Sequence, residues 1–307
     1  MSVTPFIGSG HVVLELFAGH GATIAIHHLG AAGRGVESWA DARETRALNG
    51  FETVYEDAWN VEAAAELEFD TIAGGPPCQL FSSAGKGKGR KLLPDILRAI
   101  EDGSYQSVAE LRRLVAEVAD GDDGVFLVLM PLHYIWRYRP TFVMLEQVRA
   151  VLPIWQAYLS EMAKWGYGGE TRVVRFEQYG VPQTRQRAIL LARHESAGLG
   201  PASIPAPTHS RFHEKSPERL DAGVEKWISM REALGWEVDR PAPTVTGGGA
   251  STGGAEPFAT SGRKAIETAL RSNYGTGGNP KARGERLASQ PSPTITSKAD
   301  RMMWLAS

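Results

Sequence analysis

The sequence is poor in cysteine, in long apolar runs and in excess charge of either sign. With one cysteine in 307 residues the chain forms no internal disulfide, as is usual in a reducing cytoplasm. No apolar run approaches the roughly 20 residues of a membrane span, and the N-terminus lacks a basic segment followed by an apolar one. The formal net charge of −2 gives no overall attraction for nucleic acid, so such binding requires local basic patches. With 42% hydrophobic residues, these absences predict a cytoplasmic globular protein.

The single cysteine, Cys78, follows two prolines directly after a short apolar run. Prolines fix φ and remove amide donors, so the thiol is expected on a stiff turn at the end of a strand. A lone cysteine is often a buried structural thiol, and this is the alternative. Because proline pairs rarely precede core residues, we interpret Cys78 as a nucleophile.

The N-terminal part alternates apolar strands with helices. Strands are expected at 11–17, 33–37, 53–55 and 69–73, and helices at 23–29 and 39–48. The first helix is expected to end at Gly30 and Gly33, where left-handed backbone is easily adopted. This alternation predicts an α/β fold with a parallel sheet, which binds ligands at the carboxyl ends of its strands.

A glycine-containing turn at 17–22 follows the first strand. Ile24 occupies the position of the third glycine in a pyrophosphate-binding fingerprint, so a dinucleotide fits poorly. An adenosine cofactor without phosphates fits better. Glu37 is placed to bond ribose hydroxyls, Trp39 to lie near the adenine, and Asp57 to accept from its exocyclic amine. Each of these three, taken alone, is also compatible with a solvated surface residue.

Four motifs then occur in an order that resembles the DNA (cytosine-5) methyltransferases, which use S-adenosylmethionine. Residues 16–21 are similar to the family's cofactor loop, and residues 75–79 with Phe81 and Ser82 to its catalytic loop. Residues 139–140 and 144–148 resemble its glutamate motif, and residues 179–187 its glutamine-arginine motif. The resemblance implies a Rossmann-like methyltransferase sheet with a smaller, loop-rich target-recognition region.

The resemblance also implies residue roles. Cys78 would add to C6 of a flipped-out cytosine in duplex DNA and activate C5 for methylation. Glu146 would hold or protonate N3 and the exocyclic amine, with Arg187 near O2 and Arg185 nearby. Taken alone, Glu146 is also compatible with a cap of the next element, and the arginines with a surface. The implied cofactor contacts are Phe17, Ala18, Gly19, Gly21, Glu37, Trp39, Asp57 and Pro77.

Three departures from the family pattern stand out. Gln147 replaces the usual asparagine after the glutamate, and Ala22 replaces a common glycine. The family's last motif, an asparagine with glycine and a following proline, is not found before Ser307; Asn279-Pro280 echoes it in the wrong order. Two alternatives are therefore kept: a truncated or split chain that binds DNA but needs a second, complementing polypeptide, and an RNA cytosine-5 methyltransferase.

A rise in proline after about residue 197 marks a boundary. We expect a catalytic domain at 1–197 and a target-recognition region at 198–307. Two similar segments, 240–246 and 290–296, resemble the family's ninth motif. The donors between them that are suited to phosphates and base edges are Arg263, Lys264, Arg271, Asn273, Lys281, Arg283 and Arg286.

The remaining segments give simpler expectations. The glycine- and lysine-rich run at 85–91 suits a loop that closes over DNA phosphates. Residues 107–118 have helical apolar spacing and predict a packing helix. No cysteine or carboxylate set completes a metal site, so four histidines are expected at the surface: His27, His28, His209 and His213. The resemblance implies an enzyme of restriction-modification, orphan or phage self-protection type, and we expect a monomer.

Overall fold

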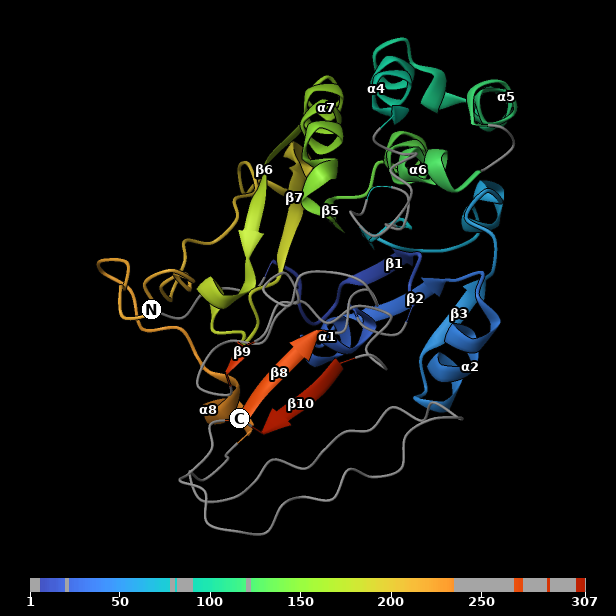
Figure 1. Cartoon of the computed structure of the whole chain (residues 1–307). Helices are drawn as coiled ribbons and strands as arrows, with labels where there is room; N and C mark the ends of the chain where they lie inside the picture. Colours follow the sequence, from blue (N-terminus) through green and yellow to red (C-terminus); the bar gives the residue numbers. More distant parts are fainter. Residues whose placement is uncertain are drawn as a thin grey trace, which may run out of the picture. The chain divides into compact units, whose positions relative to one another are not determined.

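The computed structural model describes residues 6–19, 22–77, 81, 91–119, 123–234, 268–272, 286–287 and 302–306 (Figure 1). The chain divides into two compact units, Met1–Val173 with Arg187–Pro205 and Val174–Gln186 with Ala206–Ser307. Cys78, Gly21, the basic run up to residue 90 and both segments that resemble the ninth motif lie outside the described residues. In the described part of the chain, no helix has the length and apolar character of a membrane span.

The first unit contains a seven-stranded sheet. Only the last two residues of β6 and the first residue of β7 are assigned to the second unit. The strands are β1 Val12–Leu16, β2 Ala32–Val36, β3 Glu52–Tyr55, β4 Thr71–Gly74, β5 Phe142–Gln147, β6 Tyr167–Arg175 and β7 Gln186–His194, in the order β3-β2-β1-β4-β5-β7-β6. The first five strands pair in parallel, whereas β7 is antiparallel to β5. The strand order reverses between β1 and β4, and α/β sheets bind ligands at such a point. This confirms the expected Rossmann-like α/β fold; the antiparallel β7 was not expected.

Helices cover both faces of the sheet. They are α1 Ala22–His28, α2 Ala40–Leu48, α4 Leu93–Glu101, α5 Val108–Val118, α6 Met130–Tyr138 and α7 Leu152–Ala163 (Figure 1). Short 3-10 turns occur at η1 Val61–Ala64, η2 Ser104–Gln106, η3 Asp123–Leu129, η4 Arg149–Val151, η5 Phe176–Tyr179 and η6 Glu195–Ala197. Along β1, Leu14 and Leu16 join the larger hydrophobic cluster and Val13 joins the smaller one. Successive strand residues point to opposite faces, so both faces of β1 are buried.

The strands and helices expected before residue 74 are all present, with shifted ends. Gly30 follows α1 with φ +83°, as expected of a left-handed helix end. Gly33 does not end the helix, because it lies within β2, where the strand at 33–37 was expected. A Cβ there would lie 3.4 Å from Cγ2 of Thr23, so Gly33 is a packing position against α1.

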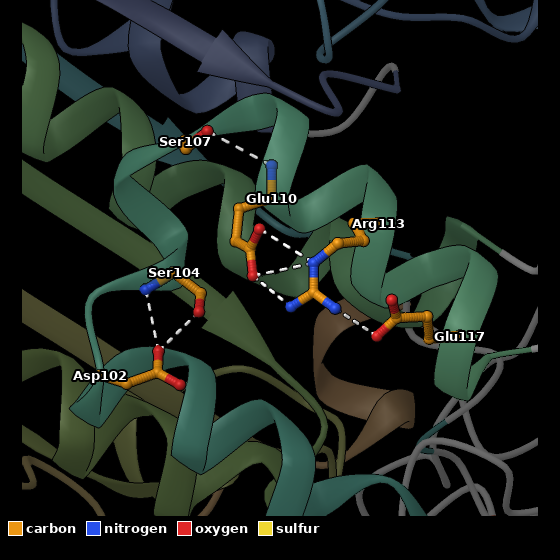
Figure 2. A network of polar contacts seen from close by, with 6 residues as sticks. All are labelled: Asp102, Ser104, Ser107, Glu110, Arg113 and Glu117. Carbon is orange, nitrogen blue, oxygen red and sulfur yellow. Dashed lines mark hydrogen bonds and ion pairs between the residues drawn. The ribbon is translucent and has the colours of Figure 1, made fainter.

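Helix α5 confirms the expected packing helix (Figure 2). The Ser107 Oγ accepts a hydrogen bond from the Glu110 N–H at 3.3 Å, which caps the first turn. Arg113 bonds Glu110 and Glu117 on the exposed side, while Leu111 is buried on the other. These contacts account for the helix without a functional role.

In the second unit, the described residues 206–229 form mainly loops, and they contain a buried aromatic pair. Phe212 and Trp227 are both buried and pack edge to face, with ring centroids 5.1 Å apart. The described part also contains α8 Met230–Leu234 and a three-stranded antiparallel sheet, β10 Met302–Ala306, β8 Thr268–Ser272 and β9 Arg286–Leu287.

The expectation of four surface histidines is half correct. His27 and His28 are exposed on α1. His213 is buried, with Nε2 2.9 Å from Oδ1 of Asp221, and the side chain of His209 is only 15% exposed. His209 and His213 lie outside the regular helices and strands, so no periodic pattern in the sequence indicated that they are buried or partly buried. Among the residues that the structure describes, no group of three or more His, Cys, Asp or Glu side chains is arranged to hold a metal ion.

Candidate active site

The turn after β1 adopts a backbone that few residues tolerate. Phe17 has φ +57° and Gly19 has φ +51°. A left-handed residue other than glycine is uncommon and is found where the surrounding structure enforces it. Here the buried Ala18 donates its N–H to the Val36 carbonyl at 3.0 Å, which ties the turn to the end of β2. The turn is therefore held in one conformation beside two strand ends.

Glu37 links this turn to the start of α2. Its Oε2 accepts from the Gly19 N–H at 2.8 Å, and its Oε1 accepts from the Trp39 N–H at 2.7 Å. A carboxylate has about four acceptor sites, so Glu37 retains capacity for hydroxyl donors. The Trp39 side chain is 64% exposed and presents an aromatic surface next to this carboxylate in the chain.

Asp57 follows β3, the next strand in the sheet. Its Oδ1 accepts from the Trp59 N–H at 2.9 Å, which fixes the exposed carboxylate in the loop. Carboxylates after β2 and β3 would repel phosphate groups but match the hydroxyls and the amine of an adenosine. The donors and acceptors at these three strand ends therefore fit S-adenosylmethionine better than a dinucleotide.

The segment that leads to Cys78 is tied to β5. A Cβ at Gly74 would lie 2.6 Å from the Leu16 carbonyl oxygen, so β4 can approach β1 this closely only with glycine. Beyond β4, the buried Pro76 accepts a hydrogen bond at its carbonyl from the Gln147 side chain. The other atom of that amide, Oε1, accepts from the Val148 N–H at 2.5 Å, and Gln147 is 1% exposed. Pro77 is exposed directly before Cys78.

Glu146 and Arg187 form an ion pair on two neighbouring strands. The Arg187 Nε lies 2.7 Å from the Glu146 Oε1, and the two side chains are 13% and 38% exposed, respectively. Glu146 and Gln147 are the last two residues of β5. The pair holds a carboxylate beside a cation at the end of β5, on the strand adjacent to β4.

Arg185 lies in the second unit, before β7. Its carbonyl accepts from the Phe176 N–H at 2.9 Å, and its guanidinium carbon lies 5.8 Å from the centre of the Phe176 ring. The structure therefore brings Glu146 and Arg187 together, and it describes Arg185 through its two contacts with Phe176.

A family model for C-5 cytosine-specific DNA methylases matches residues 12–104 and 121–234, more than half of the chain. The chain belongs to this family. Every described residue of the site above lies within the matched segments, and the gap between the segments contains α5.

Two curated relatives of this cytosine-5 methylase family share between a quarter and a third of the aligned residues. Type II methyltransferase M.AplI of Arthrospira platensis is 29% identical over 191 residues, 61% of this chain and 46% of that protein. Type II methyltransferase M.HpaII of Haemophilus parainfluenzae is 27% identical over 203 residues, 63% of this chain and 49% of that protein. The chain thus spans about half the length of each relative.

A solved structure adds a more distant likeness. The putative DNA modification methyltransferase from an Escherichia coli prophage is 16% identical, with a TM-score of 0.46 over 80% of this chain and 62% of that one.

The sequence did not point to two polar residues beside the turn at 17–19, Glu15 and Arg46. Glu15 interrupts an otherwise apolar strand, which was an available signal of a buried polar partner. Arg46 gave none, because an arginine near the end of a short helix usually lies at the surface. The structure also shows a contact of Gln147, the residue that replaces the usual asparagine: its side chain donates a hydrogen bond to the Pro76 carbonyl.

Proposed function

We propose that this chain transfers a methyl group from S-adenosylmethionine to C5 of a flipped-out cytosine in duplex DNA, through a covalent adduct between Cys78 and C6. The observation that carries the proposal is the Glu146–Arg187 pair at 2.7 Å, on the strand next to the one that leads into Pro76, Pro77 and Cys78. A carboxylic acid and a guanidinium side by side match the N3 and O2 atoms of a cytosine ring. Methylation of DNA is also what the family's description states.

The proposed chemistry assigns one task to each residue. The Cys78 thiolate forms the bond to C6, and the electrons of the C5–C6 double bond move toward C5 and the N3–C2–O2 edge. Glu146 holds a proton at N3, and Arg187 stabilises the charge that develops at O2. Bound S-adenosylmethionine would supply the methyl group for C5 from its sulfonium. Loss of the C5 proton to solvent or a base then breaks the C6–S bond and restores the thiolate.

Four side chains and the glycine turn would hold the cofactor. Glu37 would bind the ribose hydroxyls with the acceptor sites that remain beside its two amide contacts. Trp39 would cover the adenine, Asp57 would accept from the adenine amine, and Pro77 would line the side that faces the methyl group. The fixed turn at 17–19, continuing to Gly21, would lie under the amino-acid portion.

Duplex DNA is the proposed partner, and residues 198–307 are the proposed target-recognition region. The type II names of the bacterial relatives support a role in modification of DNA. In this proposal the run at 85–91 and the donors between residues 263 and 286 contact phosphates and base edges.

Methyl transfer from labelled S-adenosylmethionine tests the proposal directly. The purified chain is offered duplex DNA or transfer RNA, and the product is digested to nucleosides. We expect label in 5-methylcytosine from the DNA, and none with Cys78→Ser. Label in RNA alone would move the substrate to RNA. Binding of both ligands without transfer would favour the alternative in which a second polypeptide completes the enzyme.

A further inference from the structure

A fully buried guanidinium lies beneath the proposed cofactor turn. Arg46, near the end of α2, has a side chain that is 0% exposed. Its nitrogens donate to oxygen atoms of Glu15, Gly19, Thr23, Glu52 and Thr53. The distances are 2.6 Å to the Thr23 Oγ1, 2.7 Å to the Glu52 carbonyl and 3.3 Å to the Gly19 carbonyl. One side chain thus joins β1, the turn, α1 and β3.

The sheet leaves space for this guanidinium at Gly35 of β2. A Cβ at Gly35 would lie 2.1 Å from the Arg46 Nη2, closer than atoms can approach. The neighbouring Gly33 on the same strand differs, since a Cβ there would meet its nearest atom at 3.4 Å. The Arg46 guanidinium therefore occupies the space that a side chain at residue 35 would need.

Stability alone is a weak reason for such an arrangement. A buried ion pair is often matched or exceeded in stability by apolar residues of similar volume, because both charges lose their hydration. Burial raises the pKa of Glu15, and bonds from Thr23 and Arg46 oppose this rise. Arg46 therefore serves partly to keep Glu15 in its place, but its bond to Gly19 reaches beyond that pair.

Gly19 is the residue at which this cluster meets the proposed site. Its N–H is bound by the Glu37 carboxylate at 2.8 Å and its carbonyl by Arg46 at 3.3 Å. Both polar groups of a left-handed glycine are thus fixed by side chains from two different elements. If Arg46 moves, the Gly19 carbonyl loses this contact, and the backbone of the glycine that binds Glu37 is then held by Glu37 alone.

We propose that Arg46 is a positioning residue, which sets the affinity for S-adenosylmethionine by fixing the orientation of Gly19. This inference rests on the proposed cofactor and goes beyond it, since Arg46 itself does not contact the ligand. Arg46 holds the turn from below, and Glu37 holds it from the side of the ribose.

Two variants displace the guanidinium by independent routes. Arg46→Lys keeps the charge beside Glu15 but replaces a planar fork by one ammonium, which cannot reach all five oxygens. Gly35→Ala keeps Arg46 and pushes it with a methyl group. Gly33→Ala is the matched control, because it adds the same methyl group two residues away on the same strand. If Arg46→Lys does not fold, Glu15→Gln with Arg46→Met replaces it, since that pair leaves no unpaired buried charge.

Isothermal titration calorimetry of the full chain with S-adenosylmethionine gives the dissociation constant. The affinity for duplex DNA and the melting temperature of the ligand-free protein are measured for the same variants. We expect both displacing variants to weaken cofactor binding about tenfold, the effect of losing one charge-assisted contact. Gly33→Ala should change the dissociation constant for S-adenosylmethionine less than about twofold. The affinity for duplex DNA should also change less than about twofold in the displacing variants. A merely structural arginine would lower the melting temperature and leave the dissociation constant unchanged, which would overturn the inference while the proposed function stands. No binding by the unaltered chain would overturn the proposed cofactor, and this inference with it.

Discussion

At the scale of single residues, Glu146 contacts Arg187 and, in the proposed mechanism, would also bind the cytosine. In the structure described here its Oε1 contacts the Arg187 Nε, and its half-exposed carboxylate remains accessible for a base. A protonated carboxyl can donate to N3, whereas an amide in the same place can donate a hydrogen bond but not a proton. Glutamine therefore separates binding of the base from its activation.

Glu146→Gln is expected to lower kcat by about 10²- to 10⁴-fold, the usual contribution of a positioned acid. Affinity for duplex DNA and for S-adenosylmethionine should stay within about twofold, because most DNA contacts are to phosphates. Single-turnover methylation and fluorescence anisotropy measure the two properties. Glu161→Gln on α7, bonded to Tyr105 at 2.8 Å, is the control. A variant that lost DNA affinity at full kcat would remove Glu146 from its assigned role.

Glu177 offers a residue-scale test of pH dependence. It is fully buried in η5, with the Arg175 Nη1 3.6 Å from its Oε1. Burial raises its pKa from the ordinary 4.5, and the nearby Arg175 opposes the rise. Because the folded state then holds the proton more tightly than the unfolded state, the associated stability is present below the unfolded pKa and is lost as the pH rises through the folded pKa.

Glu177→Gln should therefore raise the urea midpoint relative to the unaltered chain at about pH 8, and by less at about pH 4. Glu232 has the opposite sign, since hydrogen bonds from the backbone and then the side chain of Ser229 lower its pKa. Glu232→Gln should lower the midpoint at the higher pH and have less effect at the lower. Circular dichroism follows both. Parallel pH profiles for Glu177→Gln and the unaltered chain would contradict the account.

At the scale of elements, the turn after β1 differs from other glycine turns in what it holds. Gly19 at φ +51° and Gly50 at φ +73° are both left-handed, and a Cβ at either would have no atom within 4 Å. Alanine at either position therefore introduces backbone strain of about 1–2 kcal/mol without a steric clash. Only Gly19 has its N–H and its carbonyl bound by Glu37 and Arg46.

Gly19→Ala is expected to weaken S-adenosylmethionine binding about tenfold, because the turn relaxes away from its left-handed conformation. Gly50→Ala should lower the melting temperature about as much as Gly19→Ala does, but it should leave the dissociation constant for S-adenosylmethionine unchanged. Calorimetric titration and thermal melts of both variants provide the comparison. Equal cofactor affinity in the two variants would show that the turn does not bind the ligand.

The elements also show what local sequence can predict. Apolar runs separated by helical spacing were enough to locate the first four strands. Glu37 and Asp57 follow the neighbouring strands β2 and β3, and their shared role in a cofactor site stays a prediction. The antiparallel direction of β7 was not predictable, because it depends on a pairing with β5 about 40 residues earlier in the chain. The contacts of Arg46 and Gln147 depend likewise on packing between elements that are distant in sequence.

At the scale of the whole molecule, the family match covers parts of both units, and the chain has nearly balanced charge. The matched segments include residues of the first unit and residues up to 234 of the second. Because the formal net charge is −2, the proposed DNA affinity would have to come from local donors, and we expect it to fall steeply with salt. The domain boundary at 197, the monomeric state and the cytoplasmic location stay predictions.

Covalent trapping on DNA that contains 5-fluorocytosine tests whether Cys78 forms the proposed bond to C6. The chain is incubated with S-adenosylmethionine and this duplex, in varied sequence, and resolved under denaturing conditions. Fluorine at C5 blocks the last elimination, so the account predicts a stable adduct that requires the cofactor and is absent with Cys78→Ser. Mass spectrometry should place the added nucleotide and methyl group on the peptide with Cys78. A folded chain that methylates cytosine in ordinary DNA yet forms no adduct, or forms one equally well with Cys78→Ser, would contradict the covalent mechanism proposed for this enzyme.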